Sequence, residues 1–145
     1  MTKQLYVVGV DGSEWSSRAA DRAIKLAAQT DADVSLVYAF EYNKGNPLAT
    51  RGIIPDAIDK NLEEENIITT ILQPMIDNAA SPTVTVKCNV LWGEPVEKIH
   101  EFVKVEKATM VFVGRRGRSR FADLLLGSVA NKLAHHSGVP VVLVP

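Results

Sequence analysis

The stretch from Val111 to Ala134, VFVGRRGRSRFADLLLGSVANKLA, joins an apolar strand pattern to a glycine-rich segment and then to a helical pattern. Two residues separate Gly114 from Gly117, nine separate Gly117 from Gly127, and Ser128 follows. The first two glycines flank a sharp turn after a buried strand, where missing side chains let backbone N–H groups approach a ligand. Gly127 and Ser128 open a helix, whose first-turn N–H groups and dipole favour an anion. The pattern G-x2-G-x9-G-S therefore predicts a phosphate cradle.

A plainer interpretation treats Gly114 and Gly117 as turn residues and Ser128 as a helix N-cap. Each feature taken alone favours this interpretation. Their combination favours the cradle, because both segments fall at the position in the sheet where ligands bind, as the strand pattern indicates.

Outward from this stretch, apolar strand patterns alternate with helical patterns, which is typical of a parallel sheet covered by helices on both faces. A helix is expected after Asp11-Gly12-Ser13 and up to about Thr30, and another, which Pro74 should kink or split, from about Ile58 to Ile76. Two more are expected after Gly93-Glu94-Pro95 and from Ser128 to Ser137. The expected strands are Leu5 to Val10, Val34 to Phe40, Thr83 to Leu91, Met110 to Gly114 and Val139 to Pro145.

The apolar content of the strands predicts their order. The first and fourth strands are continuous apolar runs, which indicates central positions, whereas the third alternates and should lie near an edge. Right-handed crossovers then favour the order 3-2-1-4-5. The fold class is thus α/β, a Rossmann-like open five-stranded parallel sheet, in one domain spanning residues 1–145. Ligands bind where the winding reverses, which is where the segments Gly9 to Ser13 and Gly114 to Gly117 meet.

Composition excludes several classes of partner. The 145 residues include 16 basic and 17 acidic ones, so no overall field attracts nucleic acid or a membrane surface. A single cysteine, Cys88, excludes an internal disulfide framework and indicates a reducing compartment. The apolar run near the start is too short for a secretory leader or a membrane span. We expect a soluble cytoplasmic protein.

The chain resembles the universal stress protein family, in particular its nucleotide-binding branch, whose signature is G-x2-G-x9-G followed by Ser or Thr. The resemblance covers nearly the whole chain and includes three further segments: VVGVDGSEWSSRAADRAIKLA, WGEPVEKI and LLLGSVANKLAHHSGVPVVLVP. It implies a Rossmann-like domain that binds ATP, usually forms homodimers, and acts as a sensor or regulator of an unknown protein partner rather than as an enzyme.

The resemblance also implies a set of site residues. Gly114 and Gly117 would lie against the ribose and phosphates, and the adenine pocket would be lined by Val10, Ala39 and Val113. Asp11 falls where the family has a carboxylate near the ribose or a phosphate-bound metal such as Mg²⁺. Many members carry a hydroxyl at the position of Ala130, so here only the backbone contact would remain. The phosphate chain would be surrounded by Gly127, Ser128, Val129 and Ala130.

Several polar residues allow two interpretations. Asp11 could be a helix N-cap with Glu14 as its capping-box partner, or it could bind a cation or a ribose hydroxyl. One of four arginines is expected to touch phosphate, without a choice among Arg115, Arg116, Arg118 and Arg120. His135 and His136 are adjacent on a helix and point in different directions, so they do not form a metal pair. Cys88 lies in the inward phase of its strand and should be core.

The sequence allows three alternative functions to be compared with nucleotide binding. An ATP-using enzyme lacks support, because neither G-x4-G-K-[ST] nor G-x-G-x-x-G is present, although slow ATP hydrolysis is an alternative. RNA binding through GRRG is disfavoured because the GXXG loop of a KH domain joins two helices, whereas this one follows a strand. A nucleotide-independent interaction dimer is the third, but that branch of the family typically lacks the glycine signature.

The last strand should lie at an edge of the sheet, and an apolar edge invites pairing with another chain. We therefore expect a homodimer through Val139 to Val144, the alternative being a monomer whose edge is blunted by Pro140 and Pro145. The segment from Glu41 to Pro55 is the expected lid. The sequence thus predicts an ATP-binding stress-response regulator. It specifies neither the stress signal nor the choice between ATP and ADP.

Overall fold

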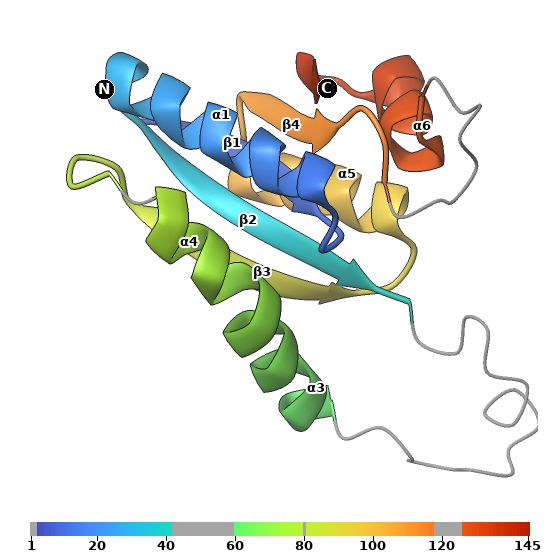
Figure 1. Ribbon diagram of the computed structural model, residues 1–145. Coiled ribbons are helices and arrows are strands. Elements are labelled where there is room, and N and C mark those ends of the chain that lie inside the picture. The colour runs from blue at the N-terminus through green and yellow to red at the C-terminus, as the bar shows by residue number, and fades with distance from the viewer. Residues whose placement is uncertain (1–2, 42–59, 80, 118–125) are drawn as a thin grey trace, which may run out of the picture.

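The computed structural model describes residues 3–41, 60–79, 81–117 and 126–145 (Figure 1). Their strands form a five-stranded sheet in the order β3-β2-β1-β4-β5, and every neighbouring pair is parallel. The predicted order and strand directions are therefore confirmed. The strands are β1 (Gln4–Val10), β2 (Ala32–Phe40), β3 (Val86–Trp92), β4 (Met110–Gly114) and β5 (Val141–Val144).

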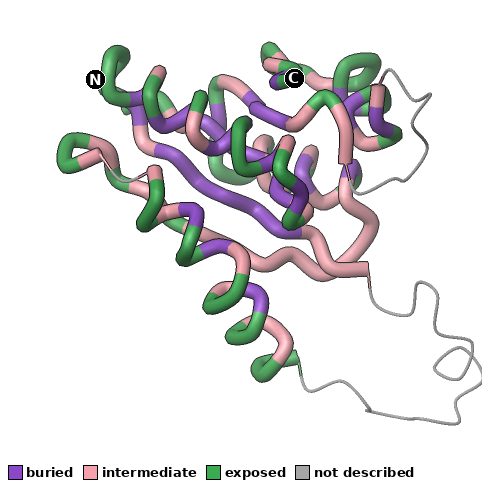
Figure 2. The backbone as a smooth tube through the Cα atoms, in the orientation of Figure 1, coloured by how far each residue is buried: buried purple, intermediate pink, exposed green. Residues whose placement is uncertain are grey.

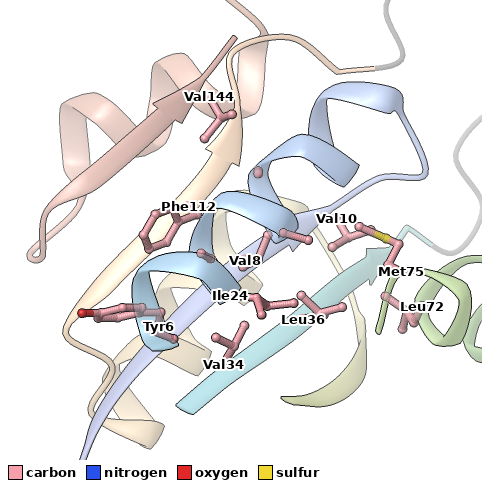
Figure 3. Close-up of a cluster of buried hydrophobic side chains, with 14 of the residues drawn as sticks. Tyr6, Val8, Val10, Ile24, Val34, Leu36, Leu72, Met75, Phe112 and Val144 are labelled. Atoms are coloured by element: carbon pink, nitrogen blue, oxygen red, sulfur yellow. The ribbon is translucent and has the colours of Figure 1, made fainter. Parts of the chain in front are cut away.

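Helices cover both faces of this sheet (Figure 1). On one face, Tyr6, Val8 and Val10 of β1 pack with the alanine-rich side of α1 and with Leu72 (Figure 3). On the other face, Val7 packs with residues of α5 and α6. This alternation along β1 follows from the two-residue period of a strand. The helical segments are α1 (Glu14–Thr30), α3 (Lys60–Ile67), η1 (Ile68–Leu72), α4 (Gln73–Ala79), α5 (Pro95–Glu106) and α6 (Ser128–His136).

The burial pattern explains which strands are central. Val7 and Val8 of β1 and Val111 and Phe112 of β4 are almost fully buried, as Figure 2 shows for the middle of the sheet. The edge strand β3 is only partly covered, and Lys87 on it is exposed. Continuous apolar runs therefore mark the strands that are covered on both faces, and alternation marks the edge.

Pro74 lies where the long helical segment changes its geometry. The segment passes from α3 into the π-helix η1, in which the backbone N–H of Gln73 donates to the carbonyl of Ile68, five residues earlier. Pro74 follows immediately and has no N–H to donate to the preceding turn. The predicted interruption at Pro74 therefore takes the form of a wider helical turn.

Cys88 of β3 is partly buried and packs against the hydrophobic cluster on the α1 face, as the alternation predicts. Burial raises the pKa of its thiol above the ordinary value, because the thiolate is poorly solvated there. The thiol therefore stays protonated at neutral pH and behaves as a small apolar group.

Candidate functional site

A cavity of about 210 Å³ opens at the carboxyl ends of β1 and β4, which are neighbours in the sheet. It lies where the order of strands reverses direction, the usual ligand position in an open α/β sheet. The structure brings every site residue named from the sequence into its wall: Val10, Asp11, Ala39, Val113, Gly114, Gly117, Gly127, Ser128, Val129 and Ala130.

The cavity also has lining residues that the sequence did not single out. Val37 lies two positions before Ala39 on β2, and Pro95 and Ile99 come from the start of α5. Their signal was present, since Val37 has the same strand phase as Ala39 and Ile99 lies one turn after Pro95. Ser16 is another such residue, whereas Gly9 and Arg116, which also line the cavity, belong to a segment and to a set of arginines that were named from the sequence.

One side of the cavity is apolar. Val37 and Val113 are buried in the cluster on the α5 face, together with Ile99. Gly9 keeps this wall close, because a Cβ there would lie 3.0 Å from Cγ1 of Val113 and 3.2 Å from Cδ1 of Ile99. Such a wall suits a flat, weakly polar group.

The opposite side presents the start of α6. Gly127 is the N-cap of this helix and contributes no side-chain hydrogen bond to the first turn. Its own N–H donates to the carbonyl of Arg115 over 2.7 Å, and its carbonyl accepts from Asn131 N–H over 2.9 Å. The first-turn N–H groups belong to Ser128, Val129 and Ala130, which all line the cavity. Ser128 is thus the first helical residue, and its interpretation as the N-cap is wrong.

The three glycines hold the wall segments close together. A Cβ at Gly117 would lie 2.7 Å from Oδ2 of Asp11, and one at Gly127 would lie 3.2 Å from the backbone nitrogen of Gly117. A Cβ at Gly114 would lie 2.6 Å from Cβ of Trp15. Gly114 therefore serves the packing of β4 against the start of α1, in addition to lining the cavity.

Asp11 does not cap α1. The N-cap is Ser13, whose hydroxyl oxygen accepts from Ser16 N–H over 3.2 Å. Asp11 Oδ1 accepts from Ser13 N–H over 2.9 Å, which fixes the carboxylate at the turn between β1 and α1. Its second oxygen is the atom that approaches Gly117. Asp11 therefore lies between two walls of the cavity.

The other polar candidates are distributed differently. Among the arginines, Arg116 lines the cavity and Arg115 is exposed, while Arg118 and Arg120 lie outside the described residues. His135 and His136 are exposed, with ring centroids 6.2 Å apart. In the described ranges, no group of three or more His, Cys, Asp or Glu side chains is arranged to hold a metal ion.

Two further expectations concern the surroundings of the site. The expected lid, Glu41 to Pro55, lies outside the described residues except for Glu41. No helix in the described part of the chain is both long enough and apolar enough to cross a membrane.

Comparison with known proteins identifies relatives over nearly the full length. The model of the universal stress protein family matches residues 6–145. Universal stress protein YxiE of Bacillus subtilis is 28% identical over 144 residues, covering 95% of this chain and 96% of the relative.

Solved structures match equally broadly. A universal stress protein in complex with cAMP is 31% identical, with a TM-score of 0.70, covering 99% of this chain and 98% of that chain. A universal stress protein from Archaeoglobus fulgidus in complex with dAMP is 21% identical, with a TM-score of 0.67, covering 100% of both chains. Since the family model matches all but the first few residues and the relatives align from end to end, the chain belongs to the universal stress protein family.

Proposed function

We propose that this chain binds an adenine nucleotide in the cavity between the ends of β1 and β4, and that occupancy regulates its conformation or its affinity for a protein partner. The observation that supports this most strongly is that all ten residues that the family resemblance implies for the site line one cavity. The ligand of the 31% identical neighbour, cAMP, is an adenine nucleotide.

The two sides of the cavity suit the two ends of a nucleotide. The base would lie on the apolar side, against Val10, Ala39 and Val113. The phosphates would lie at the start of α6, where the first-turn N–H groups and the helix dipole favour negative charge. Gly114 and Gly117 would face the ribose and phosphates. Among the described residues that line the cavity, Arg116 carries a cationic side chain.

Within this proposal ATP is the preferred ligand, with ADP as the alternative, and Mg²⁺ accompanies the phosphates. Asp11 would bind the metal or a ribose hydroxyl, because a carboxylate beside a polyphosphate is otherwise repelled. Its orientation by Ser13 N–H supports this role. The proposal includes no catalytic residue, and slow ATP hydrolysis stays an alternative. We further propose that residues 1–145 form a single domain of a cytoplasmic protein.

Pairing through β5 completes the proposed assembly. β5 lies at the edge of the sheet beside β4, and Leu143 on it is 36% exposed. An apolar strand at an edge is stabilised when a second copy covers it. We therefore propose a homodimer through Val139 to Val144.

The first experiment is the melting temperature of nucleotide-free protein with ATP, ADP, AMP or cAMP, each with and without Mg²⁺. Ligand at about one hundred times its dissociation constant adds about 2.7 kcal/mol of stability and should raise the midpoint by about 5 to 10 °C. The variant Ala39→Phe fills the apolar side of the cavity and should abolish the rise. Gly127→Val is a weaker test, because a Cβ there presses on the backbone of Gly117.

The matched control is Ala134→Phe, the same substitution at an exposed position of α6. It should retain the full rise with nucleotide. No rise for any adenine nucleotide in the unaltered protein would contradict the proposed function and would favour the nucleotide-independent interaction dimer.

A further inference from the structure

The helix α3 has few contacts that hold it in place. Ile67 at its end is its one buried residue, while Leu62 is 63% exposed. Its first turns project beyond the β3 edge of the sheet, and their backbone is mostly exposed (Figures 1 and 2). Burial of apolar surface therefore contributes little to its position, and specific polar contacts must contribute more.

Trp92, at the end of β3, supplies such contacts. Its indole Nε1–H donates to Oε1 of Glu64 over 2.6 Å, in a partly buried setting. The ammonium nitrogen of Lys60 lies 5.3 Å from the centre of the same ring, within the range of a cation–π contact. Phe40 supports the ring from β2, with ring centroids 4.7 Å apart. One side chain thus holds two consecutive turns of α3.

The chain runs directly from Trp92 into the wall of the cavity. Gly93 N–H donates to the carbonyl of Phe40 over 3.0 Å, and Glu94 caps α5 by accepting from Val96 N–H and Glu97 N–H. Pro95 comes next and lines the cavity. Gly93 and Glu94, both held by hydrogen bonds, therefore link the contact with α3 to Pro95 in the wall of the proposed site.

The other end of α3 leads toward the turn between β1 and α1. It continues into η1, where Cδ1 of Ile71 lies 3.5 Å from the position that a Cβ on Gly12 would occupy. Gly12 follows Asp11, which lines the cavity. A π-helical turn within a helix often lies at a functional site and is a common place for a helix to kink.

We propose that Trp92 is a positioning residue that couples the docking of α3 to the occupancy of the cavity. The inference rests on the proposed function, since it concerns the regulation of that site. The segment α3–η1 contacts Trp92, which begins the segment that ends in Pro95, and its residue Ile71 lies close to Gly12 in the Asp11 turn. A ligand that spans the cavity must hold both the Asp11 turn and the segment that ends in Pro95 in place. The ligand and the Glu64–Trp92 contact therefore stabilise the same arrangement of these segments. By linkage, each strengthens the other by the same factor.

The test combines hydrogen exchange in α3 with nucleotide affinity, measured on the full chain. Trp92→Phe keeps an aromatic ring but removes the indole N–H donor, and Glu64→Ala removes the acceptor. A hydrogen bond to a charged group contributes enough that either variant should speed amide exchange in Lys60–Ile67 about tenfold. Each single variant should also weaken nucleotide binding about three- to tenfold. The double variant should bind nucleotide no more weakly than either single variant, because both changes remove the same hydrogen bond. In the unaltered protein, nucleotide should slow exchange in the same segment.

The matched control is Glu65→Ala, which removes the same charge from an exposed neighbouring position of α3 and should change neither readout. Faster exchange with unchanged affinity would overturn the coupling and leave the proposed function intact, and so would equal effects in Glu65→Ala. Absence of nucleotide binding in the unaltered protein would overturn both proposals. Melting temperatures of the variants identify any that lose the fold, and Glu64→Gln, which keeps an acceptor oxygen, should restore most of the exchange protection.

Discussion

Gly114 and Gly117 have different neighbours although they belong to one motif. The first leaves room for Trp15 at the start of α1, and the second leaves room for the carboxylate of Asp11. The sequence predicts that both positions need glycine, because they follow a buried strand at a turn. It does not reveal the neighbouring atoms, since these come from a segment about one hundred residues earlier in the chain. The cap of α1 is a local choice between Asp11 and Ser13, which depends on the backbone conformation of the turn and is not decided by residue type.

Gly114→Ala tests this packing. A methyl group would lie 2.6 Å from Cβ of Trp15 and 2.9 Å from two backbone atoms, so the strand end and the helix must separate. The free energy of unfolding in urea should fall by about 2 to 3 kcal/mol. Gly138→Ala is the matched control, because nothing lies within 4 Å of the added methyl. It should leave stability unchanged or raise it by up to about 1 kcal/mol. Equal stabilities of the two variants would contradict the packing argument.

At the scale of elements, α5 begins as the sequence predicts, with a proline at its first position. Periodicity and proline position were sufficient there, because both act within one turn of helix. They were not sufficient for η1, whose wider turn depends on how the helix meets the sheet as well as on Pro74. The end of β2 was likewise predictable as a strand, whereas the contact between Phe40 and Trp92 depends on the register of β2 with β3.

The cap of α5 is a prediction at this scale. Glu94 accepts from Val96 N–H over 3.1 Å and from Glu97 N–H over 2.8 Å. Glu94→Ala leaves both donors without this partner and should lower the free energy of unfolding by about 1 kcal/mol in chemical denaturation. Glu94→Asp should recover part of that loss. Glu106→Ala removes the same charge at the other end of α5, where an acidic group opposes the helix dipole, and should not destabilise the protein.

At the scale of the whole molecule, the order of the strands was predictable because burial on two faces is visible in composition. The same reasoning places β5 at an edge, beside β4.

The variant Leu143→Lys tests the proposed dimer through β5. If two copies pair through β5, a charge at this position desolvates on association and should convert the dimer to monomers in sedimentation experiments. Val105→Lys, at a 70% exposed position on α5, is the control and should leave the mass unchanged. A monomeric unaltered protein would contradict the proposed dimer.

The parallel sheet places β1 between a strand that follows it closely and one that comes much later, since Tyr6 to Gly9 pair with both β2 and β4. During synthesis, β1 and β2 can meet while the rest of the chain is still unmade. The cavity residues of β4 and of the start of α6, from Val113 to Gly117 and from Gly127 to Ala130, leave the ribosome much later. At about 5 to 20 residues per second, Asp11 precedes Gly127 by roughly 6 to 25 s. A nascent chain therefore has no complete cavity of this kind until Ala130 has been made, and nucleotide that binds as proposed can stabilise the chain only after that point.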